Sequence, residues 1–338
     1  MIPVVFGCAG TTLSDEEAAF FSEVKPAGFI LFARNVGTPD EVRALVTALK
    51  KTTGRKHVPV MIDQEGGRVQ RLKAPHWRAY PPMETFGHMA RQDATLGASA
   101  LRLNCRLIAD DLVQLGINVN CLPVLDVPQR GADKVIGDRA FAHDPQLVGA
   151  LGRIALESLA DGGVLGVLKH IPGHGRSLVD SHHGLPRVSA SLEDLSKTDF
   201  VPFAALHDAP FAMTAHIIYQ AIDPARPATL SKVVIGRIIR MKIGFQGILF
   251  SDDLSMNALD GAIEKRAADA LAAGCDIALH CNGNLAEMKA IAAAVPRASL
   301  KLEERLATLI EEVNARQGVD RADLEKRYRD LMARYKPE

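Results

Sequence analysis

The sequence has no excess of charge of either sign and few aromatic residues. Its 338 residues include 40 Lys and Arg and 40 Asp and Glu, so the formal net charge is zero. Such a chain lacks the basic excess that drives non-specific binding to nucleic acids or membrane surfaces. Aromatic residues make up 5% of the chain, with one Trp, which leaves little material for stacking single-stranded bases. These absences favour an enzyme or a small-ligand binder without a nucleic-acid partner.

Paired cysteines and long apolar runs are also missing. The five cysteines are scattered, odd in number and without a C-x-x-C pair, at Cys8, Cys105, Cys121, Cys275 and Cys281. This pattern is typical of free thiols in a reducing compartment. The N-terminus lacks the basic and apolar regions of a secretory signal, and no apolar run approaches the roughly 20 residues of a membrane helix. We therefore expect a cytoplasmic protein with no membrane partner.

Short apolar runs alternate with helical patterns along most of the chain. Helix starts are indicated by the capping box from Ser14 to Glu17, and by Pro at the first helical position in Thr38-Pro39 and Asp144-Pro145. Eight such alternations predict a (β/α)8 barrel, with an open doubly wound sheet as the alternative. The predicted strands cover residues 3–6, 29–32, 58–62, 121–125, 165–168, 211–215, 247–251 and 276–280.

The C-terminal segment, residues 299–338, shows two further apolar stripes at helical spacing. One runs from Leu302 to Val313 and the other from Leu324 to Tyr335. We expect both helices to cover the barrel. No linker, repeat or low-complexity tract interrupts the chain, so residues 1–338 are interpreted as one catalytic barrel domain.

Polar residues follow nearly every predicted strand, where the active sites of barrels lie. Two segments are especially dense. Residues 169–186 hold four of the eleven histidines, and residues 247–256 are an apolar strand that ends in Asp252 and Asp253. On an extended strand, neighbouring side chains point to opposite faces, so one of these two carboxylates can face a ligand. We expect Asp253 to be a helix N-cap or an ion-pair partner.

These motifs resemble glycoside hydrolase family 3 and, within it, the bacterial β-N-acetylglucosaminidases of peptidoglycan recycling. The matching segments follow one another in the order of the family, at residues 62–71, 123–126, 135–139, 169–175, 180–182, 250–256 and 279–283. The resemblance implies a retaining enzyme that removes non-reducing terminal β-1,4-linked N-acetylglucosamine from anhydro-muropeptides. It implies no cofactor and no metal.

The resemblance also implies the catalytic groups. Asp252 is the expected nucleophile, which carries a covalent glycosyl-enzyme. Larger family members recruit a carboxylic acid from an additional domain, for which 338 residues leave no room. The acid and base is instead expected to be His182, because an ordinary His titrates near pH 6.5, with Asp180 as its hydrogen-bond partner.

Sugar binding is assigned by the same resemblance to donors and acceptors that can hold hydroxyl groups. The expected set is Asp63, Arg71, Arg139, Lys169 and His170. Arg68 and Asp126 are interpreted as a structural ion pair outside the site. We expect a carbohydrate substrate and a monomer.

Other interpretations stay open at this point. Phosphate could replace water as the acceptor, chitooligosaccharides could be the substrate, or the acetamido group of the substrate could take part in the reaction. From other classes, the clustered histidines could bind zinc in a metal-dependent hydrolase, or the barrel could bind sugars without catalysis.

Overall fold

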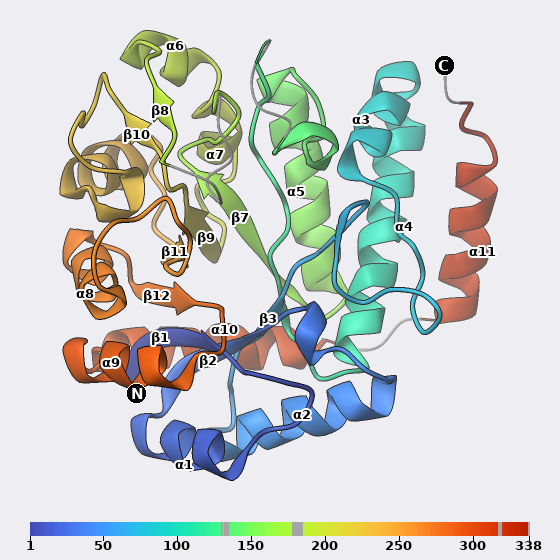
Figure 1. The fold of residues 1–338 in the computed structure, drawn as a ribbon. Helices are drawn as coiled ribbons and strands as arrows, with labels where there is room; N and C mark the ends of the chain where they lie inside the picture. Colours follow the sequence, from blue (N-terminus) through green and yellow to red (C-terminus); the bar gives the residue numbers. More distant parts are fainter. Residues whose placement is uncertain (130, 132–134, 178–184, 317–319, 337–338) are drawn as a thin grey trace.

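The computed structural model describes the whole chain except residues 130, 132–134, 178–184, 317–319 and 337–338. Eight parallel strands close into a barrel, and their order around the ring is their order in the chain (Figure 1). The first strand pairs with the last, so the predicted barrel is confirmed and the open sheet is excluded. The barrel strands are β1 (Ile2–Gly7), β2 (Pro26–Leu31), β3 (Val60–Ile62), β6 (Val119–Asn120), β7 (Leu165–Ile171), β9 (Phe211–Thr214), β11 (Ile248–Asp253) and β12 (Ile277–His280).

The fourth barrel strand differs from its predicted position. Residues 121–125 were expected, but β6 ends at Asn120. Regular pairing stops at Asn120, and Pro123, three residues further along, has no N–H to donate to a strand ladder. The chain still follows β7 by irregular hydrogen bonds, with Leu125 N donating to Lys169 O at 2.7 Å. The segment that leads to Asp126 is therefore fixed without being a regular strand.

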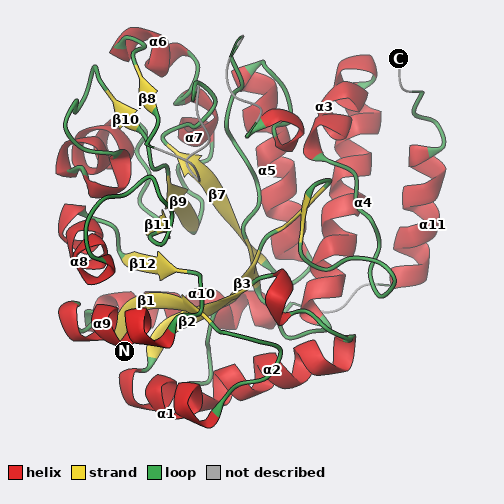
Figure 2. Ribbon diagram, in the orientation of Figure 1, coloured by secondary structure: helices red, strands yellow, loops and turns green. Residues whose placement is uncertain are grey.

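Helices surround the barrel, and two pairs of short accessory strands form sheets separate from it (Figure 2). The strand pairs are β4 (Gln64–Gly66) with β5 (Val69–Gln70), and β8 (Arg187–Val188) with β10 (Ile218–Tyr219). The helices are α1 (Asp15–Val24), η1 (Ala33–Asn35), α2 (Pro39–Thr52), α3 (Met83–Gln92), α4 (Ala94–Val113), η2 (Gly137–Arg139), α5 (Pro145–Asp161), α6 (Leu192–Lys197), α7 (Val201–Ala205), η3 (Ala228–Leu230), η4 (Val234–Lys242), α8 (Ile263–Ala273), α9 (Leu285–Ala294), α10 (Leu300–Asn314) and α11 (Arg321–Met332).

The predicted helix starts are confirmed. Ser14 and Thr38 each form a reciprocal capping box with the Glu three residues later. The Asp144 side chain accepts from Gln146 N at 3.0 Å at the start of α5. These local hydrogen bonds satisfy N–H groups that have no partner within the helix.

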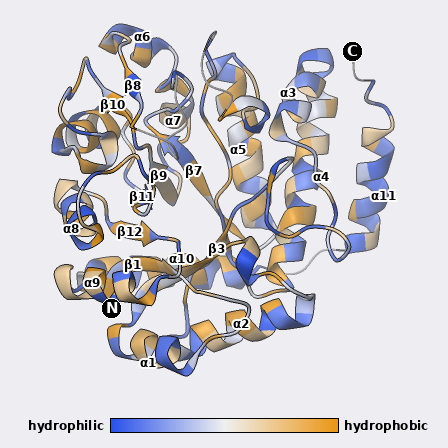
Figure 3. Cartoon of the chain, viewed as in Figure 1, coloured by the Kyte–Doolittle hydropathy of each residue, from blue (hydrophilic) through white to orange (hydrophobic). Residues whose placement is uncertain are grey.

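The apolar residues lie on the strands and on the helix faces that turn toward them (Figure 3). Of the tail helices, α10 extends the barrel interior, because Leu306, Ile310 and Val313 are buried against strand residues such as Val5 and Val119. The second, α11, packs beside α4, where the Tyr328 hydroxyl donates to Asn104 Oδ1 at 3.0 Å. Both predicted tail helices are thus present. No helix within the described residues is long and apolar enough to cross a membrane.

Candidate active site

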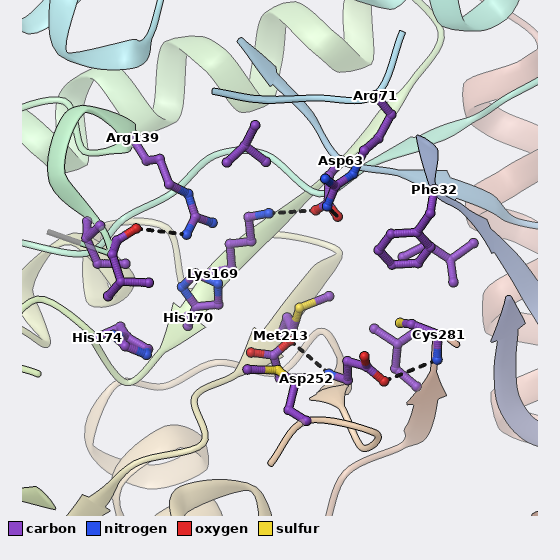
Figure 4. A pocket seen from close by; sticks show the side chains of 17 residues that line it. Phe32, Asp63, Arg71, Arg139, Lys169, His170, His174, Met213, Asp252 and Cys281 are labelled. Atoms are coloured by element: carbon purple, nitrogen blue, oxygen red, sulfur yellow. Dashed lines mark hydrogen bonds and ion pairs between the residues drawn. The ribbon is translucent and has the colours of Figure 1, made fainter. Parts of the chain in front are cut away.

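A pocket lies at the carboxyl ends of the barrel strands and collects six of the eight predicted site residues. Figure 4 shows Arg139, Lys169, Asp63 and Arg71 along one side, with Asp252 across from them. Because parallel strands all end at the same rim, residues far apart in the sequence meet there. The six are Asp63, Arg71, Arg139, Lys169, His170 and Asp252. The predicted acid and its partner, His182 and Asp180, lie outside the described residues.

Asp63, directly after β3, pairs with two of the predicted sugar-binding cations. Its Oδ1 accepts from Lys169 Nζ at 2.9 Å, and its Oδ2 accepts from Arg71 Nη2 at 2.9 Å. Burial alone would raise the pKa of the Asp63 carboxyl, but the charges of Lys169 and Arg71 outweigh it and hold this pKa far below its ordinary value. Asp63 is therefore an anion at neutral pH that can accept hydrogen bonds from sugar hydroxyls.

Glu65 is a second carboxylate of this cluster, and the sequence reasoning missed it. Its Oε1 lies 2.6 Å from Lys169 Nζ, and its two oxygens accept from Arg139 Nη2 at 2.9 Å and Nε at 2.8 Å. The residue is 1% exposed. It lies two positions beyond Asp63, inside a segment already recognised as a motif. Its position within that motif was the sequence signal that could have identified Glu65 as a site residue.

The cations of the cluster stay protonated. Burial of Lys169 disfavours its charged form, but Asp63 and Glu65 outweigh burial and raise the pKa of the ammonium above its ordinary value. The pKa of Arg139 is raised as well, because Glu65 more than offsets its burial. Both side chains therefore present N–H donors to the pocket over the whole physiological pH range.

His170 is held by Asp126, which the sequence reasoning placed outside the site. His170 Nδ1 lies 2.7 Å from Asp126 Oδ2, and Asp126 Oδ1 accepts from the backbone N–H of His170 at 3.1 Å and of His174 at 2.6 Å. Burial opposes ionisation of Asp126, but the charge of His170 and these hydrogen bonds lower its pKa to about 2. Because the Asp126 carboxylate accepts a hydrogen bond from His170 Nδ1, the other ring nitrogen, Nε2, can contact a ligand in the pocket.

The expected pairing of Arg68 with Asp126 is wrong. Arg68 Nε donates to Asp138 Oδ1 at 3.0 Å, and this pair is about half exposed. Asp126 is completely buried and fixes His170 instead. Both residues do form ion pairs, but a sequence cannot say which partner the loops bring to each of them.

Asp252 lies near the end of β11 with its backbone and carboxylate both fixed. Its N–H donates to Thr214 Oγ1 at 3.3 Å, and its Oδ1 accepts from Asp253 N at 2.8 Å. Burial would raise the pKa of the carboxyl, but His216 and His170 outweigh burial and lower it below the ordinary value. The carboxylate is thus anionic at neutral pH, as a nucleophile requires.

A chain of buried hydroxyls connects Asp252 to His216. Thr214 Oγ1 lies 2.8 Å from Thr229 Oγ1, which lies 2.7 Å from His216 Nδ1. His216 Nε2 lies 2.9 Å from the carbonyl O of Asp253, which only accepts. Thr229 Oγ1 also donates to the carbonyl O of Ala215 at 3.1 Å. The strand end that carries Asp252 is therefore braced from two sides.

Asp253 does not have either role expected from the sequence. Helix α8 begins ten residues later with Ala262 at its N-cap, and no ion pair of Asp253 is present among the described residues. Its Oδ1 instead accepts from Ser255 N at 3.0 Å and from Cys281 N at 3.1 Å. Asp253 thus ties the turn after β11 to the end of β12.

Apart from His174 and Asp253, the rest of the pocket wall is mostly apolar. Phe32 at the end of β2 lies under the guanidinium of Arg71, with 5.1 Å from Arg71 Cζ to the ring centroid. Such a contact orients the cation without occupying its N–H groups. The other apolar lining residues include Ile30, Met213, Met256 and Leu279. A pocket with one charged side and one apolar side suits a ligand with both hydroxyls and carbon–hydrogen faces.

Metal ligation was weighed for the histidine-rich segment. Among the described residues, no group of three or more His, Cys, Asp and Glu side chains is arranged to hold a metal ion. His182 and His183 of that segment lie outside the described residues. The expectation that the site uses no metal stays a prediction.

The fold and the pocket define a barrel enzyme with a half-buried carboxylate facing donors suited to a sugar. Comparison with known proteins agrees. The family described as "Glycosyl hydrolase family 3 N terminal domain" matches residues 4–313. A β-hexosaminidase of Alkalilimnicola ehrlichii is 40% identical over 284 residues, which are 83% of this chain and 80% of that protein. The β-hexosaminidase of Chromobacterium violaceum is 39% identical over 309 residues, 90% of this chain and 85% of that protein.

A solved structure resembles nearly the whole chain. NagZ from Neisseria gonorrhoeae, in complex with N-trifluoroacetyl-D-glucosamine, superposes with a TM-score of 0.86 at 30% identity, and the match covers 98% of this chain and 97% of that one. The chain belongs to glycosyl hydrolase family 3, and it is a glycoside hydrolase of the β-N-acetylhexosaminidase type.

The buried His174 predicts an acid-sensitive fold. Its burial, together with the charge of His170, lowers its pKa to about 4, against 6.5 for an ordinary His. The unfolded chain therefore binds the proton more readily between these values, so stability falls as pH decreases from 6.5 to 4. The full difference corresponds to about 3 kcal/mol. Urea unfolding at pH 7, 5.5 and 4.5 measures it.

The matched comparison uses two His→Gln variants. His174→Gln should flatten the decrease in unfolding free energy over this pH range, whereas His143→Gln, at an exposed position, should leave it unchanged. Parallel pH dependence in the wild type and in His174→Gln would contradict the assignment.

Proposed function

We propose that this protein is a retaining β-N-acetylglucosaminidase of peptidoglycan recycling. Its substrates are proposed to be N-acetylglucosaminyl-anhydro-muropeptides, from which it removes the non-reducing terminal, β-1,4-linked sugar. The observation that carries this proposal is the half-buried, ionised Asp252 facing the donors Lys169, Arg139 and His170 across one pocket. The relative from Neisseria gonorrhoeae binds an N-acylated glucosamine, which supports the choice of sugar.

In the first step, the Asp252 carboxylate attacks the anomeric carbon and the bond to the leaving oxygen breaks. His182, with Asp180 as its proposed hydrogen-bond partner, gives its proton to that oxygen. In the second step, His182 takes a proton from water, the water oxygen bonds to the anomeric carbon, and the bond to Asp252 breaks. Net retention follows from the two displacements, and His182 ends with the proton it had at the start.

The sugar-binding roles follow from the geometry of each donor and acceptor. Asp63 accepts from hydroxyl groups, while Lys169, Arg139 and Arg71 donate to ring-substituent oxygens. His170 points Nε2 to the pocket because Asp126 holds Nδ1. Phe32, Met213 and Met256 give the sugar an apolar surface to lie against.

The proposed setting is the cytoplasm. All five cysteines are free and buried, which supports a reducing compartment. The monomeric state and the single catalytic domain over residues 1–338 remain predictions.

A product assay tests the substrate. Purified protein, incubated with anhydro-muropeptides, should release N-acetylglucosamine and do so faster than from chitooligosaccharides. Added phosphate should neither accelerate turnover nor produce a sugar 1-phosphate, because water is the proposed acceptor. Faster turnover of chitooligosaccharides would contradict the proposed substrate, and a sugar 1-phosphate would contradict hydrolysis.

The proton donor is tested by the choice of leaving group. His182→Ala should slow the release of a sugar by about 10²- to 10⁴-fold, because a sugar oxygen needs protonation as it leaves. An aryl N-acetylglucosaminide with an acidic phenol should lose far less, since phenolate leaves without a proton. His207→Ala, at an exposed histidine, is the matched control. Equal losses on both substrates would mean that His182 is not the acid.

A further inference from the structure

Glu65 connects the two cations that the proposed function places on the sugar. Lys169 comes from β7 and Arg139 from the short helix η2, and the Glu65 carboxylate contacts both at 2.6 to 2.9 Å. Both cations line the pocket, whereas Glu65 is not among the described residues that line it. Glu65 therefore acts from behind the wall that a ligand would touch.

Each cation depends on this carboxylate to a different degree. Lys169 also pairs with Asp63, so it keeps one anion if Glu65 is removed. The other described hydrogen bond of Arg139 is to the carbonyl O of Val135, at 3.4 Å. The two cations repel each other, as the effect of Arg139 on the pKa of Lys169 shows. Without an anion between them, their separation and direction would change.

The pairing geometry is specific as well as charged. Glu65 receives two parallel N–H groups of Arg139, which fixes the plane of the guanidinium. The same carboxylate receives Lys169 Nζ, which fixes the end of a side chain with four rotatable bonds. The ion pairs form a continuous series of alternating charges, from Arg71 through Asp63, Lys169 and Glu65 to Arg139.

The same contacts exclude Glu65 as a proton donor. Burial favours the neutral acid, but Arg139 and Lys169 outweigh burial and hold the pKa of Glu65 below its ordinary value. A carboxylate without a proton at neutral pH, with both oxygens occupied by cations, cannot protonate a leaving group.

We propose that Glu65 is a positioning residue that holds Lys169 and Arg139 in register to bind the terminal sugar. This inference rests on the proposed function. It adds that sugar affinity is set by a buried carboxylate that does not contact the ligand.

The test is Glu65→Gln, which keeps the size of the side chain and removes its charge. The dissociation constant of N-acetylglucosamine, measured by calorimetry at pH 7, should rise at least about tenfold, as metal affinity weakens when a residue that orients a metal ligand is removed. In a Lys169→Ala background, the same substitution should add a smaller loss, on a logarithmic scale, because one of its two targets is gone and only Arg139 is left for Glu65 to position.

A second measurement is the pH dependence of sugar binding between pH 7 and 10. Lys169 faces Asp63, Glu65, Cys121 and Arg139 directly, and Asp252 across the pocket. In Glu65→Gln, which lacks the carboxylate charge, the buried Lys169 should lose its proton at a lower pH than in the wild type. Sugar binding should therefore begin to weaken at a lower pH within the alkaline range. If Glu65 only stabilised the fold, its substitution would not change the pH at which sugar binding weakens.

Two comparison variants keep the test decisive. Glu17→Gln is also at a buried Glu, but Glu17 caps α1, so this variant should bind the sugar like the wild type. Glu65→Asp keeps the negative charge on a shorter side chain, so it should weaken sugar binding. The pH at which binding weakens in the alkaline range should stay near that of the wild type. This variant also serves if Glu65→Gln does not fold.

The outcomes separate the two proposals. If the wild type binds N-acetylglucosamine and hydrolyses N-acetylglucosaminides, but Glu65→Gln, or Glu65→Asp in its place, has wild-type affinity, the role of Glu65 is wrong and the proposed function stands. A wild type that neither binds nor hydrolyses N-acetylglucosaminides overturns the proposed function.

Discussion

The contact of Lys169 with Asp63 and Glu65 is the interaction on which the pocket depends. Lys169 is 2% exposed, and a buried ammonium is stable only where anions surround it. Those two anions in turn orient Arg71 and Arg139. One buried cation at the end of β7 therefore determines the positions of four charged neighbours contributed by β4, η2 and the segments after β3 and β5.

The barrel makes this cluster possible because it delivers chain segments from different regions to one rim. At the opposite end, α10 completes the apolar interior with Leu306, Ile310 and Val313. The charged cluster thus lies above a core packed with apolar side chains, where water screens the contacts of Lys169 and Glu65 less than it would at the surface. The same setting strengthens the effect of neighbouring charges on Asp252. The backbone of Asp252 is held by Thr214 and, through Thr229, by His216.

Local and periodic features could be predicted from the sequence. The barrel and the helix caps follow from apolar runs and from hydrogen bonds within three residues of each other, such as those of Ser14 and Thr38. The end of β6 was misplaced because Pro123 belongs to an apolar run but has no N–H to donate to a neighbouring strand. The roles of Glu65, Asp126 and Asp253 were missed or wrong because a carboxylate looks the same in a sequence whatever partner the fold brings to it. The six described site residues were found through motif resemblance, and the geometry of their contacts came from the structure.

The central claim is that Asp252 forms a covalent bond to the sugar. A fluorinated N-acetylglucosaminyl fluoride measures this directly, because the fluorine substituent slows the second step while fluoride still leaves in the first. Mass spectrometry of the intact protein and of its peptides should find one sugar per chain, attached at Asp252, and no label on Asp252→Ala. Label at another residue, or no label on a protein that hydrolyses N-acetylglucosaminides, would contradict the account.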